Sequence, residues 1–291
     1  MKKLLGLTLG FAFSLAAAAP AFAAEVLYAA DGAAGNPSNL SILNPATGAV
    51  VTTIGSIGFA VTGLAIHPVT GVMYGSTGRM SANSPHSLIT INKTTGAGTL
   101  VGTYLVGSDE TMADLTFTSD GTLYGWLEPF SDDLYTINTA TGAATLVGNA
   151  GISTSGSGLA ASSSDVLFFA GALDSGPLRT INRTTGLPTT VATMDGAANQ
   201  LISALAFNAA GTLFGSRLDN VAQTANLITI NTTTGHVTVI GPSVASLDAI
   251  LFDGGTAPPS VVVPMLGERM LAILLLLLAA AGLWMSRRLV A

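Results

Sequence analysis

The chain has 291 residues and no cysteine, so disulfides and thiolate chemistry are excluded and packing alone must stabilise the fold. Residues 25–255 contain five basic and fifteen acidic residues, a net charge of about −10. Such a surface lacks the basic patch that nucleic acid or an anionic lipid surface requires, so we expect no nucleic-acid partner.

The N-terminus has the pattern of a secretory signal peptide. Lys2 and Lys3 precede an apolar run over residues 4–18, which ends in the small residues of 21–24. The apolar run is short for a transmembrane helix. We therefore expect residues 1–24 to be a signal peptide, and the mature chain to begin near Ala24 or Glu25.

A repeat follows, marked by the turn Asn-x-x-Thr-Gly. The five copies are Asn44 to Gly48, Asn92 to Gly96, Asn138 to Gly142, Asn182 to Gly186 and Asn231 to Gly235. Successive asparagines lie 48, 46, 44 and 49 residues apart. Among repeat architectures this period is typical of the four-stranded blades of a β-propeller.

Each repeat divides into four short strands, called A to D in chain order, in which apolar and small polar residues alternate. Residues 63–66 exemplify strand A and 123–125 strand B, whereas strand C precedes the Asn and strand D is of the type of 144–148. No stretch of residues 25–255 shows a sustained helical period. The pattern therefore predicts an all-β region.

The two ends of the repeat array complete each other. Residues 26–29 form a strand B with no strand A before it, and residues 248–252 form a strand A with no strand B after it. Pairing of the strand around 247–253 with the first blade would close a five-bladed β-propeller with four strands per blade over residues 25–255. An open stack of hairpins would leave both end strands unexplained.

We expect the Asn-x-x-Thr-Gly segments to be hairpin turns, because Asn bonds its own backbone and Gly supplies a positive φ. These turns and the short A-to-B connections share one face, called the short-loop face. The other face carries connections that differ between copies, at residues 76–86, 104–111, 128–133, 173–176, 194–201 and 217–225. Recognition usually resides in such loops, so we place binding on this variable-loop face.

Directly after strand B of the third copy, before the loop at 128–133, lies Trp126, the single tryptophan of residues 25–255. As an exposed aromatic beside Phe130, Asp132 and Asp133 it would suit a sugar ring or a partner surface, whereas packing against a neighbouring loop is an equal alternative. Arg217, at the start of another variable loop, is a further candidate binding residue.

Two aspartates stand at strand A positions where other copies have Gly or Ala, Asp114 in the third copy and Asp248 one place earlier in the last. We expect both near the mouth of the central channel, with Thr62 and Ser203. Carboxylates and hydroxyls there could hold Ca²⁺, which takes six to eight oxygen ligands. A water-filled polar channel is the favoured alternative, because no contiguous calcium loop is present, and we expect no cofactor.

Catalysis has little support in the sequence. His67, His86 and His236 fall on different blades, with no His-x-x-x-His spacing and no evident Ser-His-Asp set. Some five-bladed propellers are glycosidases that use channel carboxylates, so the resemblance keeps Asp114, Asp248 and Asp195 as candidates.

The C-terminus is apolar again. Residues 270–285 are uncharged and precede Arg287 and Arg288; their roughly 24 Å of helix is marginal for a hydrocarbon core of about 30 Å. A Pro-containing motif precedes the apolar segment, with Val263, Pro264, Leu266 and Glu268 at its characteristic positions.

This order resembles the IPTL and PEP types of C-terminal sorting signal in Gram-negative bacteria, although Met265 and Arg269 stand where the IPTL pattern has Thr and Trp. The resemblance implies a Pro/Val linker at 256–263 and a sorting or transmembrane tail with a hydrophobic helix at 264–291. It also implies an exosortase-like processing enzyme as a partner and membrane attachment at least before processing. A plain single-pass anchor is the alternative.

Together these features predict an exported, surface-displayed binding module without evident catalysis, which recognises a glycan or a protein through the variable-loop face. A carbohydrate-active hydrolase or lyase on the same scaffold and an inert structural surface repeat protein are the alternatives.

Overall fold

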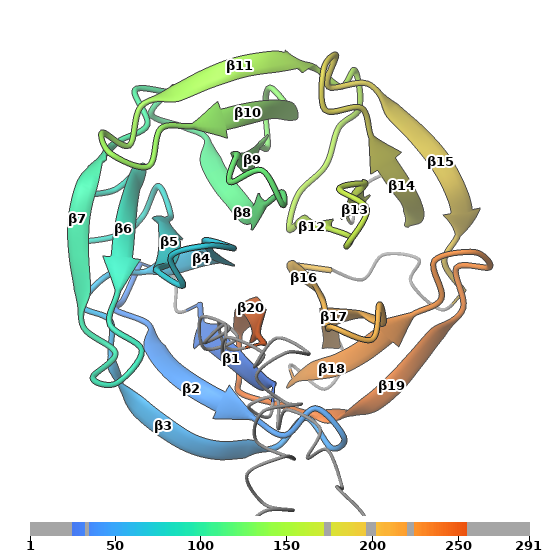
Figure 1. The fold of residues 1–291 in the computed structure, drawn as a ribbon, viewed down its shortest axis with the longest axis horizontal. Coiled ribbons are helices and arrows are strands. Elements are labelled where there is room, and N and C mark those ends of the chain that lie inside the picture. The colour runs from blue at the N-terminus through green and yellow to red at the C-terminus, as the bar shows by residue number, and fades with distance from the viewer. Residues whose placement is uncertain (1–24, 33–34, 172–175, 196–201, 220–223, 255–291) are drawn as a thin grey trace, which may run out of the picture. The chain divides into compact units, whose positions relative to one another are not determined.

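The computed structural model describes residues 25–32, 35–171, 176–195, 202–219 and 224–254. These residues form twenty β-strands in five four-stranded antiparallel sheets, arranged as blades around a central axis (Figure 1). No helix occurs among them. The prediction of an all-β, five-bladed propeller with four strands per blade is confirmed.

The strands of each blade follow one another from the central channel outwards. Blade 1 contains β20 (Leu247–Asp253), β1 (Val26–Asp31), β2 (Asn39–Leu43) and β3 (Val50–Ser56); blade 2 contains β4 (Val61–Ile66), β5 (Met73–Thr77), β6 (Ser87–Ile91) and β7 (Gly98–Thr103); blade 3 contains β8 (Thr111–Phe117), β9 (Leu123–Glu128), β10 (Asp133–Ile137) and β11 (Ala144–Asn149). Blade 4 contains β12 (Gly158–Ala161), β13 (Leu167–Ala170), β14 (Pro177–Ile181) and β15 (Pro188–Thr193); blade 5 contains β16 (Ala204–Phe207), β17 (Leu213–Asp219), β18 (Thr224–Ile230) and β19 (Val237–Pro242).

The ring closes through blade 1, which joins both ends of the array. β20 pairs antiparallel with β1, with Leu27 opposite Phe252 and Ala29 opposite Ile250. The chain that begins without an inner strand thus receives one from its own last repeat, as the sequence predicts, and no inner edge is left without a partner strand.

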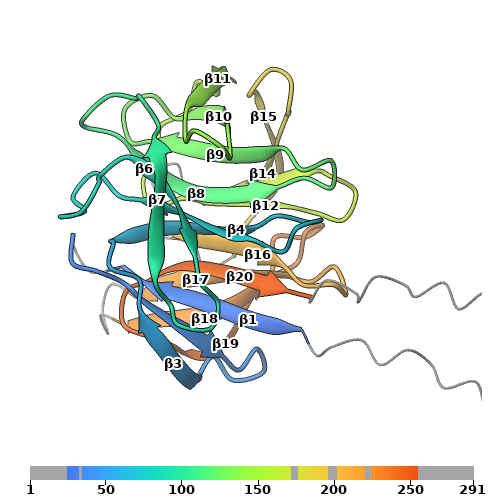
Figure 2. The same cartoon turned by 60° about the vertical axis from the view of Figure 1, so that its left-hand side comes forward.

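The blades are strongly twisted. In the side view of Figure 2, the outer strand β7 runs across the direction of β4 and β8. This is the right-handed strand twist accumulated over four strands. As a result, each outer strand runs along the rim towards the next blade.

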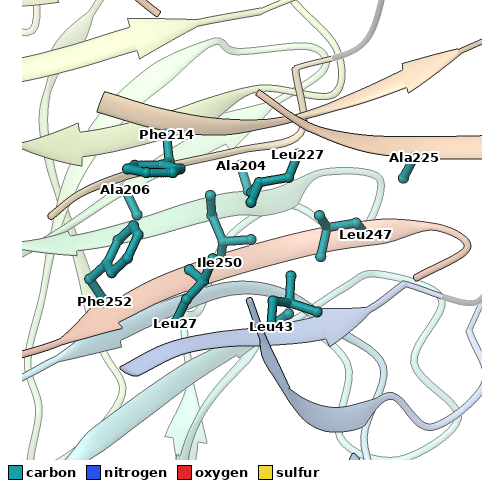
Figure 3. Packing of buried hydrophobic residues seen from close by; sticks show 11 residues of the cluster. Leu27, Leu43, Ala204, Ala206, Phe214, Ala225, Leu227, Leu247, Ile250 and Phe252 are labelled. Atoms are coloured by element: carbon teal, nitrogen blue, oxygen red, sulfur yellow. The ribbon is translucent and has the colours of Figure 1, made fainter. Parts of the chain in front are cut away.

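Apolar side chains fill the space between neighbouring blades. Between blades 5 and 1, the rings of Phe214 and Phe252 lie 4.8 Å apart and pack with Leu27, Leu227 and Ile250 (Figure 3). Each fully buried Leu or Ile stabilises the fold by roughly 1.5–3 kcal/mol. Packing of this kind recurs around the ring and compensates for the absence of disulfides.

The Asn-x-x-Thr-Gly segments are hairpin turns, as predicted, and they also join the blades. In the second copy the Asn92 side chain accepts the backbone N–H of Thr94 at 2.8 Å, and Gly96 has a φ of 82°. A Cβ atom on Gly96 would lie 2.7 Å from the carbonyl oxygen of Gly55 in the preceding blade. Equivalent contacts join Gly142 to Gly102, Gly186 to Gly148, Gly235 to Thr193 and, across the ring closure, Gly48 to Gly241.

The chain divides into two units, Met1–Gly255 and Thr256–Ala291, and the propeller belongs to the first. Within the described ranges no helix is long and apolar enough to span a membrane. The predicted signal peptide (1–24), linker (256–263) and tail helix (264–291) lie outside the described residues, as do the motif residues Val263, Pro264, Leu266, Glu268, Arg287 and Arg288.

Candidate binding cavity at the variable-loop face

The contacts between loops confirm the two predicted faces. On the short-loop face, Lys93 in an Asn-x-x-Thr-Gly turn forms a 2.8 Å ion pair with Asp253 at the end of β20. On the variable-loop face, the Arg79 guanidinium donates to the carbonyl oxygen of Asp109 at 2.7 Å. The connections at residues 76–86 and 104–111 are therefore in contact with each other.

A cavity of about 250 Å³ opens among these loops at the mouth of the central channel. Its walls come from blades 1, 2, 3 and 5 and from the loop that precedes blade 4. The polar side chains that line it are Thr62, Arg79, Ser81, Thr111, Glu128, Ser155, Ser157, Ser203 and Asp248. A second cavity of about 200 Å³ adjoins it and shares Gly32, Gly156, Ser203 and Asp248.

Glu128 ends β9 and is 6% exposed, so its carboxylate is almost withdrawn from solvent. It accepts hydrogen bonds from the Gly156 N–H at 2.7 Å and the Ser157 hydroxyl at 2.5 Å, both from the loop before β12. Burial raises the pKa of this carboxyl, and the two hydrogen bonds oppose that shift. Sequence reasoning missed Glu128; an acidic residue that ends an otherwise apolar strand was the available signal.

Asp248 lies at the start of β20, at the predicted mouth of the channel with Thr62 and Ser203. Its carboxylate accepts no hydrogen bond from the described part of the chain. Gly32 makes room for it, since a Cβ atom at that position would collide with the Asp248 side chain. Desolvation, followed by repulsion from Glu128, raises the pKa of Asp248 to about 7.

Asp114 lies near enough to Asp248 at the mouth for the two charges to interact, but it is buried and does not line the cavity. Its side chain is fully buried and is held by three backbone N–H groups: that of Leu115 at 2.8 Å, that of Leu159 at 2.9 Å and that of Leu205 at 3.2 Å. These amides belong to the inner strands of blades 3, 4 and 5. Burial raises the pKa of Asp114 well above its ordinary value, although the three N–H groups oppose the shift.

Trp126 is fully buried, so the expectation of an exposed aromatic ring was wrong and the packing alternative holds. Its ring lies 4.2 Å from that of Phe169 in blade 4, and its indole N–H donates to the Thr154 hydroxyl at 3.3 Å. The large side chain thus fills the joint between blades 3 and 4, where other copies carry smaller residues.

The remaining candidates of this loop divide into buried and exposed residues. Asp132 accepts the Thr154 N–H at 2.9 Å, and Asp133 accepts the Asn149 side-chain amide at 2.7 Å. Burial raises the pKa of both carboxyls. Phe130 is 72% exposed at the rim of the face. The two aspartates therefore fasten the loop, and Phe130 is the residue of this group that can meet a partner.

Arg217 and Asp195 lie apart from the cavity lining. Arg217 is partly buried in β17, opposite Asn226 of β18. Asp195 bonds the His236 ring at 2.5 Å in the turn of the next blade, where both side chains are largely exposed. Over the described ranges, no group of three or more His, Asp or Glu side chains could hold a metal ion.

The side chains at the other end of the channel are apolar, except for that of Thr116. A cavity of about 130 Å³ at the short-loop face is lined by the ends of the inner strands, including Ile66, Phe117, Ala161, Phe207 and Phe252. Ionisable groups are absent from its described lining. The ionisable side chains in the described lining of the channel therefore lie at the variable-loop end.

No protein-family model matches the chain, and no curated protein matches it. Solved structures with a similar fold include a protein of unknown function from Bacteroides caccae, which is 11% identical over 78% of this chain and 98% of its own, with a TM-score of 0.46. TolB from Acinetobacter baumannii is 12% identical over 77% of this chain and 54% of its own, with a TM-score of 0.49. A gluconolactonase from Xanthomonas campestris is 14% identical over 77% of this chain and 81% of its own, with a TM-score of 0.47. At these identities the similarity concerns the propeller fold alone.

Proposed function

We propose that the chain is an exported, surface-displayed binding module that recognises a glycan through the cavity at the variable-loop face. The observation that carries this proposal is the pair of carboxylates, Glu128 and Asp248, in one cavity with six hydroxyl side chains. A few convergent polar groups in a concave site are what fixes a small ligand in place. A protein partner would instead have to dock on the rim, around Phe130.

The size and polarity of the cavity favour a sugar. A volume of about 250 Å³ accommodates a unit of monosaccharide size rather than a folded protein surface. Carboxylates and hydroxyls are the side chains that hydrogen-bond sugar hydroxyls. The net charge of about −10 over residues 25–255 argues against strongly anionic glycans as ligands.

A glycan array probed with the full chain tests this proposal. We expect binding to a restricted set of glycans, a loss of at least about tenfold in affinity for Asp248→Asn, and no loss for Asp120→Asn. Asp120 is an exposed carboxylate of the short-loop face, so its replacement makes the same charge change away from the cavity. An array without any specific signal would contradict glycan recognition.

A carbohydrate-active hydrolase or lyase is the second candidate, because the cavity holds two carboxylates and the pKa of one is raised to about 7. A carboxyl whose pKa is raised towards neutral pH, beside a second carboxyl, is the arrangement of glycoside hydrolysis. Release of reducing ends from a polysaccharide panel, lost in Glu128→Gln and Asp248→Asn, would support the enzyme. Glycan binding without release would support the binding module.

The proposal includes export and surface display, which rest on the N- and C-terminal sequence patterns. N-terminal sequencing of the protein recovered from cells should find a start near Ala24 or Glu25. The intact mass should reveal whether the chain ends near the Val263 to Glu268 motif, as processing by a sorting enzyme requires. A start at Met1 would contradict export through a signal peptide.

A further inference from the structure

Four of the six hydroxyl groups that line the cavity, those of Thr62, Ser81, Ser157 and Ser203, donate their protons to the protein. The Thr62 hydroxyl donates to the Met112 carbonyl oxygen at 2.7 Å, and the Ser203 hydroxyl to the Leu247 carbonyl oxygen at 3.0 Å. The Ser81 hydroxyl donates to the Asn83 carbonyl oxygen at 2.8 Å. A hydroxyl has one proton and two lone pairs, so these groups can offer a ligand only acceptors.

The two carboxyl groups add acceptors to the same walls, and they add negative charge in their ionised forms. Glu128 receives two short hydrogen bonds from the protein and still has accepting capacity, since a carboxylate has about four acceptor sites. Asp248 accepts none from the described residues and lies where the two adjoining cavities meet. Both hydrogen-bond polarity and charge therefore favour a cationic donor at Asp248.

The protein itself supplies little positive charge to this cavity. Arg79 is the one basic side chain in the described lining, and its guanidinium is exposed and bonded to the Asp109 carbonyl oxygen. A sugar hydroxyl brings one proton and needs donors in return. A primary ammonium group brings three N–H donors, a positive charge and no acceptor, which is the complement of this wall.

We infer that the cavity binds the ammonium group of a primary amine at Asp248 and Glu128, so that the glycan of the proposed function is one with a free amino sugar. The ammonium site depends only on the cavity, whereas the identification of an amino sugar rests on the proposed function. An N-acetylated sugar lacks both the charge and two of the three donors, so the cavity discriminates against it.

Calorimetric titration of the full chain at pH 7 tests the inference with matched probes. Propylammonium is compared with 1-propanol, and glucosamine with glucose and N-acetylglucosamine. We expect each amine to bind at least about tenfold more tightly than its neutral counterparts, since tenfold corresponds to about 1.4 kcal/mol. High salt should weaken the amine binding, because it depends on charge.

Variants locate the site. Asp248→Asn should lower amine affinity about tenfold or more. It should fold normally, because the described residues donate no hydrogen bond to Asp248. Gly32→Ala keeps both charges but displaces the Asp248 side chain, and it should lower the affinity as well. Asp120→Asn, on the short-loop face, should bind amines as the wild type does.

The outcomes distinguish a failure of the ammonium site from a failure of glycan recognition. Equal binding of amines and neutral analogues, amine binding unchanged in Asp248→Asn, or Ca²⁺ binding without amine binding would overturn the inference. Array binding to glycans without amines, lost in Asp248→Asn, would overturn it and leave glycan recognition standing. Binding of propylammonium with an array that shows no glycan would support the ammonium site and contradict the glycan ligand.

Discussion

The two ends of the central channel are built by the same five inner strands and differ in chemistry. At the variable-loop end the strands begin among Thr62, Thr111 and Ser203, and two carboxylates join them. At the short-loop end they finish on apolar residues such as Phe117 and Phe207. The repeat is thus regular where the blades pack, and its copies diverge where a ligand can enter.

The same contrast holds between two aspartates of the inner strands. Asp114 is surrounded by three backbone N–H groups and ties three blades together, whereas Asp248 accepts no hydrogen bond from the described residues and faces a cavity. One carboxylate has its hydrogen-bonding capacity used by the fold. Asp248 has its hydrogen-bonding capacity available for a ligand, and its desolvated carboxylate lowers the stability of the fold.

The largest expected effect is that of Asp114→Ala. It would leave three buried N–H groups without an acceptor, at about 1–3 kcal/mol each, so we expect the free energy of unfolding to fall by about 4 kcal/mol. Chemical denaturation measures this. Asp120→Ala, on the exposed surface, should lower it by less than about 1 kcal/mol. A similar small loss for Asp114→Ala would refute the role of Asp114 as an anchor.

Asp248 should make stability depend on pH. In the unfolded chain its carboxyl loses its proton near its ordinary pKa of 3.8, whereas the folded protein holds the proton up to about pH 7. The free energy of unfolding should therefore fall by about 4 kcal/mol as the pH rises from about 4 to about 7, since each of about three pKa units contributes about 1.4 kcal/mol.

Asp248→Asn should remove the contribution of Asp248 to this dependence and raise the melting temperature at pH 8, while the raised pKa values of Asp114 and Glu128 keep their own contributions. Glu128, Arg79 and Asp114 also act on this region and are unchanged in the variant. Asp120→Asn serves as the control because the pKa of Asp120 is lowered to about 2, outside this range. A wild-type melting temperature that rises between pH 5 and 8 while that of Asp248→Asn does not would contradict the account.

A smaller effect is expected at the rim joints between the blades. Gly96→Ala combines a positive φ of 82° with a Cβ atom 2.7 Å from the Gly55 carbonyl oxygen, so it should destabilise by about 2–3 kcal/mol. Gly211→Ala is a matched control, because its φ is 78° but no atom lies within 4 Å of the added Cβ. It should cost about 1 kcal/mol. Equal losses for both would show that the turn does not touch the neighbouring blade.

The smallest effect on stability is expected for Phe130→Ala. Its side chain is 72% exposed, so the free energy of unfolding should change by less than about 0.5 kcal/mol. If the ligand extends from the cavity over the rim, glycan affinity should fall about threefold. Val69→Ala, which is 74% exposed on the short-loop face, should change neither quantity. A large loss of stability for Phe130→Ala would contradict its position at the surface.

The sequence predicts the fold because each element of the repeat has a local cause. The Asn-x-x-Thr-Gly turn, the alternation of the strands and the two unmatched end strands each determine one step of the architecture. The site is less predictable, since it depends on which side chains neighbouring blades cover. Nothing next to Trp126 in the sequence indicates that Phe169 and Thr154 enclose it, 43 and 28 residues further along.

Glu128 and Asp114 illustrate the same limit. Glu128 of blade 3 shares a cavity with Asp248 only because the ring closure places β20 between the inner strands of blades 2 and 5 at the central channel. Asp114 is buried because the backbone amides of three inner strands donate to it, and the spacing of residues in the sequence does not predict that arrangement. Departures from the repeat pattern predicted a site at the variable-loop end of the channel, where the structure has a cavity, and only three-dimensional contacts identify the residues that line it.

The most direct test of a ligand site at the variable-loop end is the affinity of the full chain for its best array glycan, measured in parallel for Asp248→Asn and Asp120→Asn. The account predicts a loss of at least about tenfold for Asp248→Asn and none for Asp120→Asn. Unchanged affinity in Asp248→Asn, or an equal loss in both variants, would contradict it.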